Sequence, residues 1–447
     1  MGLLVQNNPG YRRAHFPVGN AGGANLGNRR PSPGQGEPEE QRVRPRPNLT
    51  KIATSLIALV IMLVAFSGAA GAQQTTPFTP VPEPPELDNV EAWGLFDADT
   101  GLYLAGKNPD EQVPIASTTK MMTGIVVLKE GADLDEEVTV SQQAESYVGL
   151  TYSNVGLIAG ERLSLRDLLV ASLIPSGTDA AYALAEHLGG GSVNNFVGRM
   201  NAEASSMGLE NTRFDSPAGL DTDDNYSNVR ELARIAQAGL AYPLFAELVG
   251  TTDATIRTQN REIEIFNTNQ LLNSYPPATG VKTGTSPQAG ANLVASAEAG
   301  DESYIAVVLG AEDSEERYQA ARTILEYGFD RYERESLVSQ DEVYEELPLP
   351  YRRGESVELI ATRDINASVD PNSEIERQVT TPEPPPEAEA GQELGEVEVL
   401  VDGESAGSSS LVAREGYEQA SLWNMAWYGI GSAWDWVWSS LTELLFG

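Results

Sequence analysis

The chain has 447 residues, enough for two or three domains, and carries a formal net charge of −36. It has no cysteine, which excludes disulfides, thiolate catalysis and thiolate-metal sites, and its 2 histidines are too few for a zinc site built on several histidines. The strong negative charge argues against nucleic acid or an anionic lipid surface as the main partner.

The first part of the chain indicates a membrane-targeting segment. Residues 1–51 hold seven arginines, one lysine and three glutamates, a net charge of +5, and we predict a disordered basic tail on the cytoplasmic side. Residues 52–72 form an uncharged, largely apolar run behind this positive flank. Because Ala70-Gly-Ala72 resembles a cleavage site, the run is either a cleaved signal peptide or a retained signal anchor. In both cases we expect the rest of the chain to be exported to the extracytoplasmic face of the cell membrane.

A globular domain is expected over residues 89–335, after a proline-rich linker at residues 73–88. Apolar segments predict strands at residues 92–96, 102–105, 280–285, 291–297 and 304–309. Helical periodicity, with a break at Pro175-Ser-Gly, covers residues 117–130, 161–188, 194–207, 229–241 and 315–332. Strands from both ends of the domain would share one five-stranded antiparallel sheet flanked by helices, which is an α+β fold.

A second, smaller unit is expected over residues 338–413. Apolar and polar residues alternate at 356–361 and at 397–401, and Asp402-Gly403 predicts a turn that reverses the second of these strands. We therefore predict a small β-domain.

The C-terminal residues 416–447 hold five of the six tryptophans. Apolar residues recur there at steps of three or four, at Trp423, Trp427, Ile430, Trp434, Val437, Leu441 and Leu445. This spacing predicts an amphipathic helix with an aromatic face that suits the bilayer interface, and the alternative is a helix that docks on its own domain. The segment has no Lys or Arg, so membrane binding would depend on burial of apolar groups.

Two of the chain's five lysines lie in short motifs, Ser117-Thr-Thr-Lys120 and Lys282-Thr-Gly284. A serine hydroxyl needs a base to act as a nucleophile. His187 is the one histidine outside the N-terminal tail, and its surroundings predict an ordinary helix end. Lysine remains as the base, since arginine does not lose its proton in proteins.

The two motifs suit acyl transfer at the end of a peptide. Ser117 and Lys120 are three residues apart and share one helix face, and burial would favour the neutral amine that accepts the serine proton. A strand with Lys282 and Thr283 adds an ammonium group and a hydroxyl, which together could hold a substrate carboxylate. Such a carboxylate implies a peptide end rather than a bond in mid-chain.

Several segments resemble the serine D-alanyl-D-alanine carboxypeptidases, which are the low-molecular-mass penicillin-binding proteins. They include Ile115–Thr123, Ser176–Ala181, Thr212–Leu220 and Gly280–Thr285, in the family's order and spacing over about residues 88–335. The resemblance implies a transpeptidase/β-lactamase-like domain with a five-stranded antiparallel sheet flanked by helices, then a small β-sandwich domain and a C-terminal amphipathic helix.

The resemblance also implies a role for each motif residue. Ser117 would be the acyl-ester nucleophile, Lys120 the general base, and Ser176 the relay of a proton to the leaving D-alanine. The backbone amides of Ser117 and Thr285 would form the oxyanion hole. The implied partners are a peptidoglycan pentapeptide ending in D-Ala-D-Ala and β-lactam antibiotics, with no metal or cofactor. The implied substrate-binding residues are Thr178, Lys282, Thr283, Gly284 and Thr285.

One departure from the family falls in the second motif, which is usually Ser-Gly-Asn and is Ser176-Gly-Thr178 here. Threonine keeps a hydroxyl but lacks the amide that would orient the lysine and the substrate, so we expect weakened turnover. Two alternatives stay open, a non-catalytic peptidoglycan-binding protein and a β-lactamase. The glutamate motif that would direct the hydrolytic water in a β-lactamase is not found in the sequence.

Overall fold

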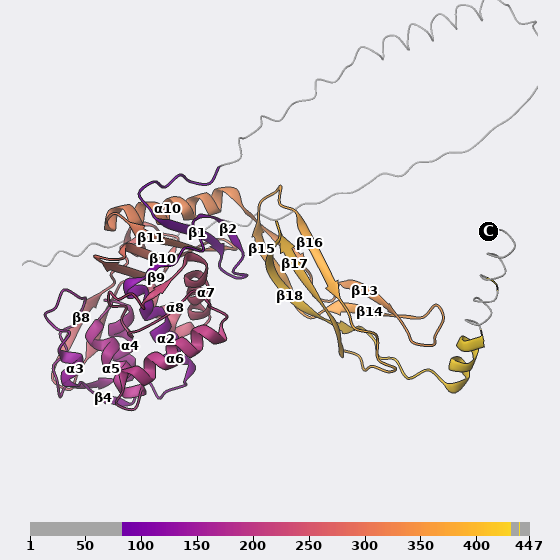
Figure 1. Cartoon of the computed structure of the whole chain (residues 1–447), viewed down its shortest axis with the longest axis horizontal. Coiled ribbons are helices and arrows are strands. Elements are labelled where there is room, and N and C mark those ends of the chain that lie inside the picture. Colours follow the sequence, from indigo (N-terminus) through magenta and orange to yellow (C-terminus); the bar gives the residue numbers. More distant parts are fainter. Residues whose placement is uncertain (1–82, 431–437, 439–447) are drawn as a thin grey trace, which may run out of the picture. The chain divides into compact units, whose positions relative to one another are not determined.

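The computed structural model describes residues 83–430 and Trp438 (Figure 1). The predicted basic tail at 1–51, the apolar run at 52–72 and most of the linker at 73–88 lie outside the described residues. The described residues belong to one compact unit. Among the described helices, none has the length and apolar character needed to cross a membrane.

The first domain is built on an antiparallel sheet with the strand order β2-β1-β11-β10-β9. Its strands are β1 (Ala92–Asp97), β2 (Tyr103–Lys107), β9 (Ala278–Ser286), β10 (Gly290–Ala299) and β11 (Glu302–Ala311). Pairing of β1 with β11 joins the two ends of the domain, with Ala92 opposite Leu309. The predicted α+β class and the five-stranded antiparallel sheet are confirmed.

Both faces of this sheet are buried, and side chains alternate between the faces along each strand. Phe96 and Val307 pack into the larger core under most of the helices, while Leu95 and Val308 pack into the core under α10 (Ser314–Arg331). Figure 1 shows α10 along one face of the sheet and most of the other helices on the opposite face. Because both faces are covered, β11 is a nearly continuous apolar run in the sequence.

The other helices are inserted between β2 and β9. They are α2 (Lys120–Lys129), α3 (Gln142–Glu145), α4 (Leu165–Leu173), α5 (Thr178–Leu188), α6 (Val193–Ser206), α7 (Val229–Leu240), α8 (Pro243–Gly250) and α9 (Leu271–Ser274). The side chains of Ser164 and Asn228 cap α4 and α7 by accepting hydrogen bonds from backbone amides of the first turn. The predicted break at Pro175 separates α4 from α5, so the second motif lies at a helix start.

Short strand pairs inside the helical part were not predicted from the sequence. They are β3 (Val113–Pro114) with β6 (Tyr226–Ser227), β4 (Glu137–Thr139) with β5 (Arg162–Ser164), and β7 (Asp253–Arg257) with β8 (Glu262–Phe266). Strands this short have too few residues for a period of two to stand out from the sequence around them.

The C-terminal β-domain contains a five-stranded sheet of order β13-β14-β18-β17-β16 and a two-stranded sheet of β12 and β15. The strands are β12 (Glu333–Val338), β13 (Val343–Pro348), β14 (Ser356–Ala361), β15 (Ile365–Val369), β16 (Ile375–Thr380), β17 (Glu393–Val401) and β18 (Glu404–Ala413). The predicted turn at Asp402-Gly403 joins β17 to β18, and both residues adopt a positive φ. The β-domain has a core of its own, so the predicted second unit is confirmed as a β-domain.

The described part of the C-terminal segment contains a helix over residues 422–430. This helix begins at Leu422 rather than at residue 416, because Tyr417 still exchanges two backbone hydrogen bonds with Ala388. The rest of the predicted amphipathic helix lies outside the described residues, apart from Trp438.

Candidate active site

Ser117 lies on a tight helical turn that leads directly into α2. The turn, η1 (Ala116–Thr119), is a 3-10 helix, and Ala116 has φ +47, which is unfavourable for a residue with a side chain. Gly219 packs against this turn so closely that a Cβ would lie 1.9 Å from the Ala116 carbonyl oxygen. A strained backbone held by close packing thus fixes the position of the half-buried Ser117 hydroxyl.

Lys120 is the direct partner of Ser117. Its Nζ donates to Ser117 Oγ at 3.0 Å and to the Ala218 carbonyl oxygen at 2.8 Å, and its side chain is fully buried. Burial lowers the pKa of Lys120 to about 7, while the Asp179 carboxylate acts in the opposite direction. Near neutral pH a large share of Lys120 is therefore the uncharged amine, which can accept a proton.

The second motif fills the break between α4 and α5. Ser176 has φ +65 and is buried, and its Oγ has no hydrogen-bond partner within the described part of the chain. A buried hydroxyl without a partner is uncommon away from functional sites. Thr178 begins α5, is also buried, and its backbone amide donates to the Ser153 carbonyl oxygen at 2.8 Å.

Asp179 supports the second motif and was not predicted from the sequence. It is fully buried, and its carboxylate accepts hydrogen bonds from the backbone amides of Val155, Leu157 and Ala180. These bonds fix residues 153–157 against the start of α5. Acidic residues are common in the first turn of a helix because they interact favourably with the helix dipole. The sequence alone therefore gives no reason to single out Asp179.

The third motif lies on β9, an edge strand that packs against the turn carrying Ser117. A Cβ on Gly284 would lie 2.7 Å from the Ile115 carbonyl oxygen and 3.2 Å from the Ser117 amide nitrogen. Only glycine therefore permits this approach. Thr285, the next residue, is exposed at the end of the buried part of the strand.

Lys282 and Thr283 are buried on the same strand. Lys282 Nζ donates to the Thr283 carbonyl oxygen at 3.1 Å, and the Thr283 hydroxyl lies 2.6 Å from the Thr268 hydroxyl. Burial lowers the pKa of Lys282 well below its usual range, and the positive charges of Lys120 and Arg317 act in the same direction. A nearby anionic substrate group would raise the pKa of Lys282 again, because it stabilises the charged ammonium. The surroundings of Lys282 therefore favour binding of a carboxylate.

Arg317 is a further cation at this site that sequence reasoning missed. It projects from α10, is buried, and its Nη1 donates to Thr285 Oγ1 at 2.7 Å and to the Gly284 carbonyl oxygen at 3.2 Å. Its Nε has no hydrogen-bond partner among the described residues. No local motif marks Arg317 in the sequence, because the fold alone brings α10 to this end of β9.

His187 plays no part in this arrangement. It lies in the last turn of α5, with Nε2 3.3 Å from Glu136 Oε1, and the predicted helix-end role is confirmed. In the described ranges, no cluster of three or more His, Asp or Glu side chains is placed to hold a metal ion.

The arrangement suits acyl transfer to a serine. It combines a hydroxyl, a buried amine of lowered pKa beside it, and two buried cations next to it, Lys282 on β9 and Arg317 on α10. The family model for D-alanyl-D-alanine carboxypeptidases matches residues 80–313, more than half of the chain. The chain belongs to this family. A second model, for the C-terminal domain of penicillin-binding protein 5, matches residues 332–419.

Members of the carboxypeptidase family resemble this chain over both domains. DacF of Bacillus subtilis, a D-alanyl-D-alanine carboxypeptidase, is 31% identical over 381 residues, which cover 82% of this chain and 95% of DacF. DacC of Escherichia coli, also a D-alanyl-D-alanine carboxypeptidase, is 32% identical over 362 residues, which cover 77% of this chain and 88% of DacC. The solved structure of penicillin-binding protein 5 from Haemophilus influenzae has a TM-score of 0.65 and 31% identity, and the match covers 75% of this chain and 100% of that one.

Proposed function

We propose that this chain is an exported enzyme that removes the terminal D-alanine from peptidoglycan stem peptides through an acyl-enzyme on Ser117. The observation that carries the proposal is the contact between Ser117 Oγ and the buried, readily deprotonated Lys120 amine. Family membership supplies the reaction class, and the contact supports Ser117 as the nucleophile and Lys120 as its base.

The reaction would begin with proton transfer from Ser117 to the neutral Lys120 amine. The serine oxygen then attacks the carbonyl carbon of the bond between the last two D-alanines. The oxyanion that forms would accept hydrogen bonds from the backbone amides of Ser117 and Thr285. Ser176 would relay a proton to the leaving D-alanine nitrogen as the C–N bond breaks. A water molecule then attacks the ester, regenerates the serine hydroxyl and releases the shortened peptide.

The carboxylate of the substrate would be held by the third motif. Lys282, Thr283 and Thr285 are the donors expected from the sequence, and Arg317 adds a guanidinium hydrogen-bonded to Thr285. A guanidinium binds a carboxylate well and keeps its charge at every physiological pH. β-Lactams, which carry a carboxylate near their reactive carbonyl, would acylate Ser117 in the same way.

Membrane association is part of this proposal. The apolar run at residues 52–72 would direct export, and the C-terminal helix would bind the membrane surface by burial of its aromatic side chains. In support, Trp423 and Trp427 are 70% and 56% exposed, so their rings are not used to pack against the β-domain.

The proposal is tested by D-alanine release from a soluble peptide that ends in D-Ala-D-Ala. Residues 79–447, which contain the compact unit, are assayed beside Ser117→Ala, with thermal unfolding as a check on folding. Release by the unsubstituted protein alone supports both the activity and the nucleophile. Folded protein without release would contradict the proposal and favour a non-catalytic peptidoglycan-binding role, with Thr178 as the first residue to replace.

A further inference from the structure

The tip of the β13–β14 hairpin meets the C-terminal helix. The Tyr351 ring, at the tip, lies edge-on to the Tyr428 ring of the helix, with 5.7 Å between the ring centroids. The Arg353 guanidinium lies 5.7 Å from the centroid of the same Tyr428 ring. A hollow of about 410 Å³ separates tip and helix and is lined by Tyr351, Arg352, Arg353, Glu355, Asn424, Trp427 and Tyr428.

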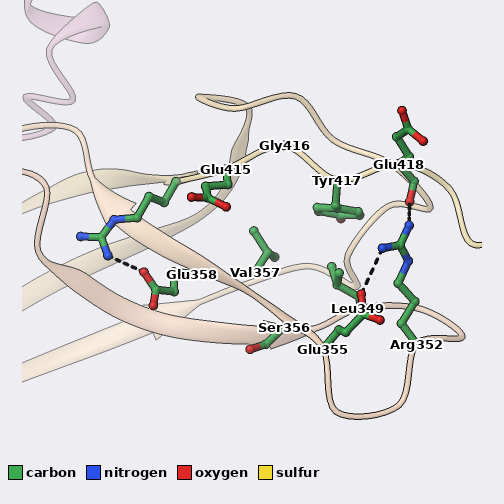
Figure 2. A pocket seen from close by; sticks show the side chains of 11 residues that line it. Leu349, Arg352, Glu355, Ser356, Val357, Glu358, Glu415, Gly416, Tyr417 and Glu418 are labelled. Atoms are coloured by element: carbon green, nitrogen blue, oxygen red, sulfur yellow. Dashed lines mark hydrogen bonds and ion pairs between the residues drawn. The ribbon is translucent and has the colours of Figure 1, made fainter.

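The segment that leads from β18 to the helix is held on the β-domain. Tyr417 exchanges backbone hydrogen bonds with Ala388, and its hydroxyl donates to the Pro385 carbonyl oxygen at 2.9 Å. Arg352, from the hairpin, donates to the Glu418 carbonyl oxygen at 2.7 Å, across a neighbouring hollow of about 520 Å³ shown in Figure 2. The start of the helix is therefore fixed beside the hairpin tip, and the two elements present one surface.

This surface is apolar and open to solvent. Its large apolar side chains are between 50% and 85% exposed, namely Tyr351, Leu422, Trp423, Trp427 and Ile430. The two tryptophan rings contact each other edge to face, 6.2 Å between centroids. Soluble proteins rarely leave a contiguous apolar patch of this kind uncovered, so a partner is expected to cover it.

The charges on this surface select the partner. The two hairpin arginines, Arg352 and Arg353, are matched by two glutamates, Glu355, which pairs with Arg352 at 3.1 Å, and Glu418, whose backbone Arg352 contacts. The helix contributes no Lys or Arg, so the surface carries no excess of positive charge. Attraction to an anionic lipid or a nucleic acid therefore has no basis here. Tyrosine and tryptophan rings settle at the headgroup level of a bilayer, where an arginine can bury its stem and keep its guanidinium at the phosphates.

We propose that the β13–β14 hairpin tip and the C-terminal helix together form one lipid-facing surface, which enters the headgroup region of a phospholipid bilayer by burial of aromatic rings, without a requirement for anionic lipid. The inference rests on the proposed export and extends it, because the hairpin becomes a second membrane contact. Two contacts on a folded domain would also fix the orientation of the β-domain on the membrane.

The test measures flotation of residues 79–447 with phosphatidylcholine vesicles, since the apolar run at 52–72 would bind vesicles by itself. Tyr351→Ser should lower the vesicle partition coefficient about fivefold, because one aromatic ring fewer is transferred from water into the bilayer. Phe266→Ser is the matched control, since the Phe266 ring is 67% exposed at the end of β8 in the first domain, opposite Asp253 of β7. This control should float like the unsubstituted protein, and adding phosphatidylglycerol should not raise the partition.

Three results would overturn the inference. Tyr351→Ser could float as well as the unsubstituted protein, binding could require phosphatidylglycerol, or the surface could instead hold two copies together in a dimer that Tyr351→Ser dissociates. D-Alanine release by each variant reports separately on the proposed function. Suppose that the folded protein binds vesicles as expected but releases no D-alanine. This result would contradict the proposed carboxypeptidase function and would still support the lipid-facing surface.

Discussion

The Asp179 carboxylate at the start of α5 is the negative group that acts on the buried Lys120 amine at the start of α2. Burial lowers the pKa of Lys120 and Asp179 raises it, and the balance lies at about 7. Lys282, on β9, has its own pKa lowered in part by the charge of Lys120. The proton affinity of the proposed base thus depends on its burial and on charges from neighbouring elements.

The first prediction concerns the pH dependence of the reaction. Only the neutral form of Lys120 can take the proton from Ser117, and that form is scarce below its pKa. We therefore expect kcat/KM for D-alanine release to rise as pH increases through about 7, the pKa of Lys120. A pH profile of kcat/KM on a substrate with no group titrating in this range measures the effect.

A substitution of the proposed base completes this prediction. Lys120→Arg keeps a positive charge that cannot be lost, so activity should fall by about 10²- to 10⁴-fold. Lys129→Arg, at the exposed end of the same helix, is the matched control and should change little. An unchanged rate in Lys120→Arg would rule out Lys120 as the base.

The second prediction separates the electrostatic role of Asp179 from its structural one. Asp179→Asn keeps the size of the side chain and removes its charge, so the pKa of Lys120 should fall further. The rising limb of the pH profile should then move to lower pH. A purely structural role would lower the rate and leave the limb in place, which would contradict the prediction. Asp167→Asn, in the first turn of α4, is the control and should leave the limb unmoved.

Much of the fold could be predicted because it depends on local patterns. The apolar run at Tyr304–Leu309 and the helical period of α10 are each visible within a short window, and together they predict a sheet covered by helices. The pair Ser117 and Lys120 could be predicted for the same reason, since a spacing of three on a helix places two side chains together.

The rest of the site depends on contacts between distant parts of the chain. Arg317 reaches Thr285 because α10 packs along the sheet, and the Ala218 carbonyl reaches Lys120 because a loop passes beside the turn of Ser117. The Asp179 carboxylate accepts hydrogen bonds from the backbone amides of Val155 and Leu157. Any residue type can supply a backbone amide, so the sequence of this segment does not reveal the contact. Such contacts are a consequence of the fold, so no local sequence motif predicts them.

The third prediction concerns the departure in the second motif. Thr178 is buried at the start of α5, two residues after Ser176, and lacks the amide group of asparagine. Thr178→Asn should raise kcat/KM by about two- to tenfold, which is the value of one added hydrogen bond to the substrate or the lysine. Thr178→Val, which keeps the shape and adds no amide, should not raise it. An unchanged rate in Thr178→Asn would contradict this account.

The last prediction tests the close approach of β9 to the nucleophile. In Gly284→Ala the new methyl group would lie 3.2 Å from the Ser117 amide nitrogen, where the oxyanion is proposed to bind, and 2.7 Å from the Ile115 carbonyl oxygen. The strand or the turn must shift, and a displacement of about 1 Å at a reacting group can cost about 10²-fold in rate. D-Alanine release and the rate of acylation by a fluorescent penicillin measure the loss.

The matched control for this substitution is Gly198→Ala. Gly198 lies within α6, and a new Cβ there would have no atom of the described residues within 4 Å beyond the backbone of α6 itself. Alanine there should therefore leave the rate unchanged and stabilise the helix by about 0.5–1 kcal/mol. If Gly284→Ala released D-alanine at the unsubstituted rate, the space in front of the Ser117 amide would not be the site of the oxyanion. Since both steps of the proposed reaction use that space, acylation and deacylation should slow together in Gly284→Ala.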